Sequence, residues 1–350
     1  MFRILSIDGG GIRGIIPAKI LSLVEDELRR QDKSTDLSDY FDLICGTSTG
    51  GIIAIALGLG LSPKTILQLY TSHAGEIFPK RTLKGMIARV IGGKSLYERD
   101  RLAQLLEQTY SGAVDGTTTV RLGHSKTRLC IPTYDANKGA MHVFKTSHHP
   151  QLLRDYQIPA HMVALATASA PIYFDSYDFE YTPQDGGEKM YYYSNIDGGI
   201  MANNPTLIGY TEAVQSLNIP VGEVAILSLG TGDHLFRDIP RTMNAKSWFY
   251  RKKRILPLYD LISSAQADYT SNLMKFYQRG LGEGGQPQFV YERIQHNFEA
   301  EHVIAMDDSS RKSLLRLENI GQELYGDHSN TILTTFFGDV KDEFVPENKL

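Results

Sequence analysis

The stretch DYFDLICGTSTGGIIAIALGL, residues 39–59, decides the fold. Its first part, residues 39–45, is short and apolar and predicts a buried strand. Its last part, residues 50–59, is apolar on every side and predicts a buried helix. Between them lie only small residues, which allow the chain to turn sharply from strand to helix. This order of strand, tight turn and buried helix indicates an α/β domain.

The residues before this stretch repeat the same order. Residues 2–7 predict a buried strand that ends at Asp8 and three glycines, and residues 15–30 predict a helix with apolar side chains at helical spacing. Two strand–helix pairs within sixty residues are typical of a parallel sheet covered by helices. Further strands are expected near 128–134, 140–146, 189–196 and 224–229, and further helices from residue 63 and over 98–109, 160–168, 205–217, 258–276 and 313–324.

The five residues Gly46-Thr47-Ser48-Thr49-Gly50 carry the first chemical signal. They match the pattern G-x-S-x-G between a predicted strand and a predicted helix, which is the setting of a nucleophile elbow. Gly46 and Gly50 leave room for the turn, and Ser48 is expected at the strand end. Its own N–H and the N-terminus of the helix would face a developing negative charge. A plain Gly/Ser-rich turn is the alternative interpretation, and the strand–helix setting favours the nucleophile.

A serine hydroxyl group is a poor nucleophile until a base takes its proton. The chain has ten histidines, which lie in loops, polar stretches or helix faces, and none follows a strand end in a turn. Asp197 does follow a predicted strand, and Gly198 and Gly199 after it let the backbone approach a neighbour closely. Because strand ends of an open parallel sheet converge on one crevice, we expect Asp197 beside Ser48. An ordinary Asp-Gly turn is the alternative.

A glycine-rich loop, Asp8-Gly9-Gly10-Gly11-Ile12-Arg13-Gly14, joins the first strand to the first helix. Its glycines fit G-x-G-x-x-G, so a dinucleotide site is one interpretation. That site would need an acidic residue closing the second strand, which here ends at Cys45-Gly46 and runs into the serine turn. The other interpretation is an oxyanion hole, because successive glycine N–H groups at a helix N-terminus form an anion site. Arg13 would add a fixed charge there or brace the loop.

These motifs, in this order, resemble the patatin-like phospholipases, and the resemblance covers roughly residues 2–232. It rests on Asp8-Gly9-Gly10-Gly11-Ile12-Arg13-Gly14, Gly46-Thr47-Ser48-Thr49-Gly50-Gly51 and Asp197-Gly198-Gly199. Two further stretches look like the same family, namely Thr167-Ala168-Ser169-Ala170-Pro171-Ile172-Tyr173-Phe174 and Ser228-Leu229-Gly230-Thr231-Gly232.

The resemblance implies a three-layer α/β/α fold with a largely parallel central sheet. It implies calcium-independent hydrolysis of acyl esters in membrane glycerophospholipids, without a metal or a cofactor. Ser48 would be the nucleophile and Asp197 the base of a Ser–Asp dyad. The oxyanion hole would be lined by Gly10, Gly11, Ile12 and Arg13. Residues 1–232 are expected to form the catalytic core, and residues 233–350 a helical extension packed on the same domain, whose role the sequence leaves open.

The composition excludes some classes of protein. The chain has 350 residues, 42% of them hydrophobic, and a formal net charge of −4, so DNA and RNA are not expected as partners. Cys45 and Cys130 are too few for a disulfide framework or a structural zinc site, which favours a reducing cytoplasm. The longest apolar stretch, residues 50–61, is shorter than the about 20 residues that span a bilayer. We expect a cytoplasmic protein, peripheral at the inner membrane when active.

The run Trp248-Phe249-Tyr250-Arg251-Lys252-Lys253-Arg254 combines aromatic and basic residues, which suits an anionic bilayer surface. A solvated surface loop is the alternative interpretation.

The compact length of the chain also resembles that of the bacterial phospholipase effectors of anti-phage signalling. That resemblance implies activation by a cyclic di- or trinucleotide, although the chain carries no separate nucleotide motif.

Two other classes of function stay open from the sequence. One is a constitutive hydrolase of small esters or thioesters with the same dyad. The other is a non-catalytic lipid- or nucleotide-binding module. The oligomeric state also stays open between a monomer, a homodimer and a higher oligomer.

Overall fold

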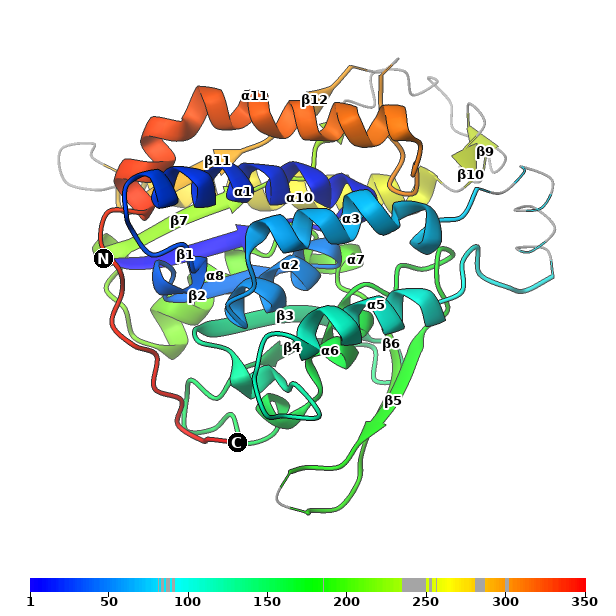
Figure 1. Cartoon of the computed structure of the whole chain (residues 1–350), viewed down its shortest axis with the longest axis horizontal. Coiled ribbons are helices and arrows are strands. Elements are labelled where there is room, and N and C mark those ends of the chain that lie inside the picture. The colour runs from blue at the N-terminus through cyan, green and yellow to red at the C-terminus, as the bar shows by residue number, and fades with distance from the viewer. Residues whose placement is uncertain are drawn as a thin grey trace.

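Figure 1 shows the computed structural model of the chain. It describes residues 1–350 except 81, 83, 84, 86–88, 90, 91, 185, 235–249, 252, 253, 256, 281–286, 300 and 301. The strands of its main sheet are β1 (Phe2–Ile7), β2 (Leu43–Gly46), β3 (Arg128–Asp135), β4 (Ala140–Lys145), β5 (Tyr177–Tyr181), β6 (Met190–Asp197), β7 (Val224–Leu229) and β11 (Val290–Ile294). Its α-helices include α1 (Ile15–Arg30), α2 (Thr49–Gly58), α3 (Pro63–Ile77), α5 (Asp100–Ser111), α6 (Ala160–Thr167), α7 (Gly199–Ala202), α8 (Thr206–Thr211), α10 (Pro257–Arg279) and α11 (Arg311–Phe336).

The main sheet has the strand order β11-β7-β1-β2-β3-β6-β5, and β4 pairs with β3 outside this path. The five strands from β11 to β3 are parallel to their neighbours. β4, β5 and β6 are antiparallel to the strands beside them. The expectation of a largely parallel central sheet is therefore confirmed.

Side chains that alternate along β1 give each face of the sheet its own core. Leu5 and Ile7 belong to the core that includes residues of α1, α2, α3 and α11, whereas Phe2 and Ile4 belong to the core closed by α8 and α10. Each apolar side chain that leaves water in these cores contributes about 1.5–3 kcal/mol to stability. Helices thus cover both faces, which confirms the three-layer α/β/α fold.

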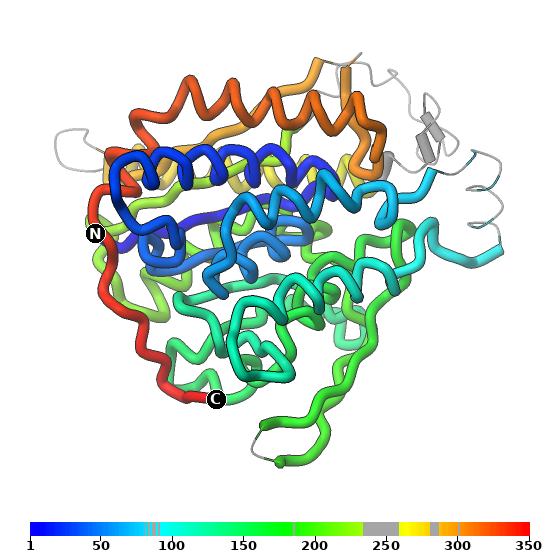
Figure 2. The backbone as a smooth tube through the Cα atoms, viewed as in Figure 1, coloured from blue at the N-terminus to red at the C-terminus, as the bar shows by residue number. Residues whose placement is uncertain are grey.

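The C-terminal part of the chain joins this fold instead of forming a separate layer. β11 extends the parallel sheet beside β7, and α11 packs along α1, as the tube in Figure 2 shows at the top of the molecule. Helix α11 is longer than the predicted 313–324, and it passes α1 closely at Gly321, where a Cβ atom would lie 2.8 Å from Cβ of Lys19. Besides the helices expected over 233–350, this segment thus supplies a strand of the central sheet.

The strands β2 and β6 lie far apart in the sequence but pair with the same edge of β3, one after the other. The first half of β3 pairs with β2, down to the pair Cys45↔Cys130, and its second half pairs on the same edge with β6, starting at Thr133↔Asp197. The sequence interpretation placed Asp197 at the end of a parallel strand, whereas β6 runs antiparallel. Asp197 still lies beside the turn that follows β2, because β6 pairs with the part of the β3 edge that extends beyond β2.

The aromatic and basic run 248–254 lies only partly within the described residues. Of the aromatic and basic run 248–254, residues Trp248, Phe249, Lys252 and Lys253 lie outside the described residues, and Tyr250–Arg251 pairs with Arg254–Ile255 as the short antiparallel strands β9 and β10. Among the described residues, no helix combines the length and hydropathy that crossing a membrane requires.

Candidate active site

Ser48 occupies a strained turn between β2 and α2. Its φ and ψ are 55° and −123°, a backbone conformation that costs a non-glycine residue about 1–3 kcal/mol. The two neighbouring glycines permit the turn, since a Cβ atom at Gly46 would overlap the carbonyl of Gly50, and one at Gly50 would overlap the carbonyl of Ile7. The sequence therefore forms the sharp strand-to-helix turn that G-x-S-x-G predicts. Strain of this kind is typical of functional sites.

The backbone N–H of Ser48 is already engaged. It donates to the Thr167 hydroxyl oxygen at 3.0 Å, and that hydroxyl group donates to the carbonyl of Pro132 at 2.6 Å. This contact ties the turn to α6 and β3 and corrects the expectation that the serine N–H faces the developing charge. Thr167 belongs to one of the sequence stretches singled out above, but its role as an anchor of the turn could not be deduced from the sequence.

Asp197 is buried beside this turn. Its Oδ1 accepts the N–H of Gly199 at 2.7 Å, and its Oδ2 has no hydrogen-bond partner of ordinary geometry within the described part of the chain. Burial raises the pKa of Asp197 to about 6, whereas the nearby hydroxyl groups of Ser48 and Tyr259 and the N–H of Gly199 oppose the rise. The Ser48 hydroxyl group thus lies near enough to act on the carboxyl group, although the two side chains form no hydrogen bond of standard length and angle. A carboxylate with this pKa can accept a proton near neutral pH.

The glycine loop lies against the other side of the Ser48 turn. Gly9 donates its N–H to the carbonyl of Asn203 at 3.0 Å, and Ile12 donates its N–H to the carbonyl of Met306 at 2.8 Å. The N–H groups of Gly10 and Gly11 have no acceptor among the described residues. Gly11 has φ 58° and lines the cavity above Ser48, so a donor of this loop borders the cavity.

Arg13 braces the loop. Its buried guanidinium group donates to the carbonyl of Gly232 at 3.3 Å and to the carbonyl of Gly10 at 3.4 Å, and its N–H donates to Gly10 at 3.2 Å. Of the two roles that the sequence left open for Arg13, these contacts favour bracing.

A buried ion pair fixes the start of the same loop. Arg293 on β11 contacts both carboxylate oxygens of Asp8, at 2.9 and 2.5 Å, and also donates to the hydroxyl group of Ser228 at 3.0 Å. Burial acts to lower the pKa of Arg293, but the attraction of Asp8 outweighs it, so the pKa is raised and the charge is retained. Sequence reasoning missed Arg293, because nothing near residue 293 shows that β11 ends beside Asp8.

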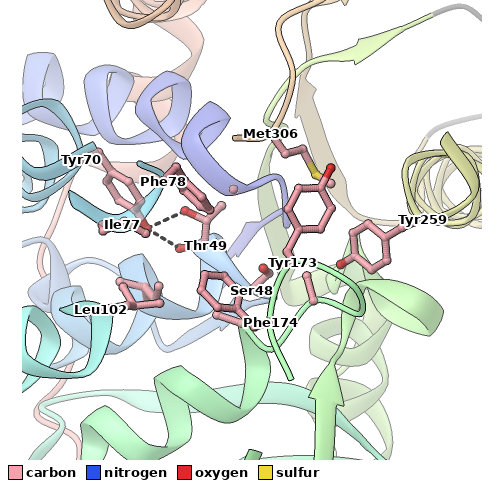
Figure 3. Close-up of a pocket in the computed structure, with 14 residues that line it drawn as sticks. Ser48, Thr49, Tyr70, Ile77, Phe78, Leu102, Tyr173, Phe174, Tyr259 and Met306 are labelled. Carbon is pink, nitrogen blue, oxygen red and sulfur yellow. Dashed lines mark hydrogen bonds between the residues drawn. The ribbon is translucent and has the colours of Figure 1, made fainter. Parts of the chain in front are cut away.

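Figure 3 shows the cavity that surrounds Ser48. About 50 Å³ of it is open to the centre of a water-sized sphere, so the enclosed space is small. Its lining is mostly apolar and comes from the helices and loops around the turn, namely Gly11, Ser48, Thr49, Ile52, Tyr70, Ile77, Phe78, Leu102, Ala168, Ala170, Tyr173, Phe174, Tyr259 and Met306. The polar groups of Thr49 and Tyr70 bond to each other at 2.5 Å. The cavity therefore offers apolar surroundings to a group that contacts Ser48.

The lining of this cavity contains neither a histidine nor a set of metal ligands. Within the described ranges, the three side chains close enough to share a cation are Cys130, His148 and Glu212, whose ligand atoms lie within 4.8 Å of one another. They belong to a different part of the fold, and Glu212 already pairs with His148 at 2.9 Å and with Lys145 at 2.5 Å. Near Ser48 the described residues thus offer hydroxyl groups, the carboxyl group of Asp197 and backbone N–H groups.

Comparison with known proteins identifies the family of the chain. The profile of the family described as "Patatin-like phospholipase" matches residues 5–210, so the chain belongs to this family and is a lipid-hydrolysing enzyme. Patatin-like protein 2 from Arabidopsis thaliana is 30% identical over 93% of this chain and 83% of its own length. Two proteins called cGAMP-activated phospholipase are also similar. The Vibrio cholerae protein is 29% identical over 96% of this chain and 94% of its own length, and the Escherichia coli protein is 28% identical over 92% and 88%.

Proposed function

We propose that this enzyme cleaves fatty-acyl esters of membrane glycerophospholipids through an acyl-enzyme on Ser48, with Asp197 as the base. The observation that carries the proposal is the position of Ser48. It stands on a strained turn at the base of an apolar cavity, beside a buried carboxyl group whose pKa is about 6. An apolar cavity suits an acyl chain, because each buried CH₂ contributes about 0.8 kcal/mol.

The reaction follows from these positions in two steps. Asp197 accepts the proton of Ser48 as the hydroxyl oxygen attacks the ester carbonyl, and the lysophospholipid leaves with the proton as the acyl-enzyme forms. Water, activated by the same carboxylate, then attacks the acyl-enzyme and releases the fatty acid.

The oxyanion hole is part of the same proposal. Of the four residues expected there, Gly10 and Gly11 keep N–H groups without acceptors in the described part of the chain, so they serve as the donors. Ile12 and Arg13 hold the loop in place through their bonds to Met306 and Gly232. Each donor of this kind typically lowers the barrier by about 2.7–4 kcal/mol.

The acid limb of the pH–rate profile should report Asp197. Since the base must be ionised and burial raises the pKa of Asp197 to about 6, kcat/KM should be constant above pH 7 and fall about tenfold per pH unit well below pH 6. The measurement is kcat/KM on a water-soluble nitrophenyl acyl ester between pH 4.5 and 8.5. A profile that stays flat down to pH 4.5 would contradict Asp197 as the base.

We also propose that a cyclic di- or trinucleotide activates the enzyme, which would then act from the cytoplasm at the inner membrane. The support is the similarity to two proteins called cGAMP-activated phospholipase over most of each chain. A constitutive esterase is the alternative, because the Arabidopsis relative carries no such description in its name.

A lipid screen separates these alternatives. Phosphatidylglycerol and phosphatidylcholine vesicles are incubated with the protein, with and without cyclic di- and trinucleotides, and released fatty acid is measured by mass spectrometry. We expect release from vesicles that rises at least about tenfold with one of the nucleotides, a coupling of typical allosteric size. Equal release without any nucleotide would contradict the activator. Release from short nitrophenyl esters but never from vesicles would contradict the phospholipid substrate.

A further inference from the structure

The hydroxyl group of Tyr259 reaches the site from a part of the chain that the family profile does not cover. The profile ends at residue 210, whereas Tyr259 lies in the first turn of α10. Its side chain is buried, lines the same cavity as Ser48, and packs against Tyr173 with ring centroids 6.2 Å apart (Figure 3). A polar group in this position is available to the reacting side chains.

The turn after Asp197 brings its carboxyl group and Tyr259 together. The short helix α7, which begins at Gly199, packs directly against α10. A Cβ atom at Gly199 would lie 2.6 Å from Oη of Tyr259 and 3.0 Å from Oδ1 of Asp197. The hydroxyl group and the carboxyl group therefore border the same small space, and any side chain at residue 199 would force one of them aside. This gives the second glycine of Asp197-Gly198-Gly199 a physical reason.

We propose that Tyr259 is a positioning residue, whose hydroxyl group donates toward the carboxylate of Asp197 and holds it ionised against Ser48. The inference rests on the proposed function and extends the Ser–Asp dyad by a third side chain. A carboxylate offers about four acceptor sites, so donation from Gly199 and Tyr259 leaves room for the Ser48 proton. The C-terminal segment thereby takes part in the reaction that the N-terminal motifs perform.

The ionisable groups around the pair are consistent with this role. Burial raises the pKa of Tyr259 well above its ordinary value, and Asp197 adds to the rise, so the hydroxyl group keeps its proton to donate. The other titratable groups that face Tyr259 are Asp260 on α10 and Tyr173 on the loop after α6. Because the nearby hydroxyl group of Tyr259 acts to lower the pKa of Asp197, loss of this group should raise it.

Replacement of Tyr259 with phenylalanine tests the proposal, since it deletes the hydroxyl group and keeps the ring. We expect the midpoint of the acid limb of kcat/KM to move up by about one pH unit, in line with the loss of one hydrogen bond to a charged group. At pH 6 kcat/KM should therefore fall about fivefold through kcat, and at pH 8 it should hardly change, with KM unchanged. Asp260 and Tyr173 are the same in both proteins, so the difference reports the hydroxyl group.

Two further variants complete the experiment. Tyr97→Phe is the matched control, because Tyr97 is a buried tyrosine that stacks on Tyr173 but donates to Asp307 at 2.8 Å, and its midpoint should not move. Gly199→Ala places a Cβ atom between the Tyr259 hydroxyl group and the Asp197 carboxyl group, which forces the two apart without deleting either, and should move the midpoint upward as Tyr259→Phe does. It is the independent test if Tyr259→Phe does not fold.

The outcomes separate this inference from the proposed function. An unmoved midpoint in both Tyr259→Phe and Gly199→Ala, in proteins whose activity still requires Ser48, would overturn the role of Tyr259 alone. An equal loss at pH 6 and pH 8 without a shift would reduce Tyr259 to a packing residue and also overturn it. Absence of any Ser48-dependent hydrolysis in the unmodified protein would instead overturn the proposed function.

Discussion

Replacing Ser48 with alanine is expected to reduce fatty-acid release by at least about a thousandfold, because no other group in the cavity can form the acyl-enzyme. The described lining holds the hydroxyl groups of Thr49, Tyr70, Tyr173 and Tyr259 besides that of Ser48. Those of Thr49 and Tyr70 bond to each other, and burial raises the pKa of each of the three tyrosines. Release of radiolabelled fatty acid from phosphatidylglycerol vesicles measures the effect, and loss of fluorophosphonate labelling at residue 48 confirms its cause.

Asp197→Asn is the companion to this experiment, and it should separate activity from stability. It removes the base and should lower the rate by a comparable factor. It also removes a buried charge whose pKa is about 6 in the folded protein and ordinarily 3.8, so the variant should be more stable at pH 8 by on the order of 2–3 kcal/mol. Because the pKa of Asp197 is higher in the folded than in the unfolded protein, ionisation of this group destabilises the fold. The stability that Asp197→Asn gains is therefore complete above pH 6 and disappears as the pH falls toward 3.8.

The unfolding temperature of each variant shows whether it is folded. Alanine at residue 48 keeps the strained φ of 55°, so its unfolding temperature should match that of the unmodified protein. An active Asp197→Asn protein would contradict the dyad, whatever its stability. An inactive variant that unfolds at lower temperature at pH 8 would contradict the interpretation of Asp197 as a buried, costly charge.

The elements around Ser48 could be predicted because each one carries its own local pattern. The apolar run before Gly46, the small residues of the turn and the apolar helix after Gly50 specify β2, the turn and α2 without reference to the rest of the chain. Every residue of α2 is buried, as its uniform apolar character indicates. The family resemblance drawn from these motifs is confirmed by the profile that covers residues 5–210.

The contributions of the C-terminal segment could not be predicted, since they depend on which strand pairs with which. The run Phe289-Val290-Tyr291 is typical of a strand and could have indicated β11, but no local signal places Arg293 beside Asp8. Tyr259 lies in a helix that the sequence did predict, yet its approach to Asp197 follows only from the packing of α10 on α7. The antiparallel direction of β6 is likewise decided by the free edge of β3.

The second large effect is expected for Arg293→Met, which should lower the free energy of unfolding by about 3–5 kcal/mol. The guanidinium group and its partner Asp8 are both buried, so the substitution leaves a carboxylate without its opposite charge inside the sheet. Since Asp8 opens the glycine loop, fatty-acid release by the variant that remains folded should fall as well. Urea denaturation followed by circular dichroism gives the free energy of unfolding. Lys189→Met is the matched control, because Lys189 pairs with Glu180 at 2.7 Å on the surface and its loss should leave that free energy nearly unchanged.

The double variant Asp8→Asn, Arg293→Met distinguishes a buried charge from a general packing defect. Removing both charges takes away the unpaired carboxylate, so the double variant should recover part of the stability that Arg293→Met loses. If it is instead less stable than Arg293→Met by the full cost of a second independent substitution, the two residues are not coupled and the ion pair does not hold the loop. Recovery of stability without recovery of fatty-acid release would show that the loop needs the paired charges for its shape, and not merely for its place in a stable sheet.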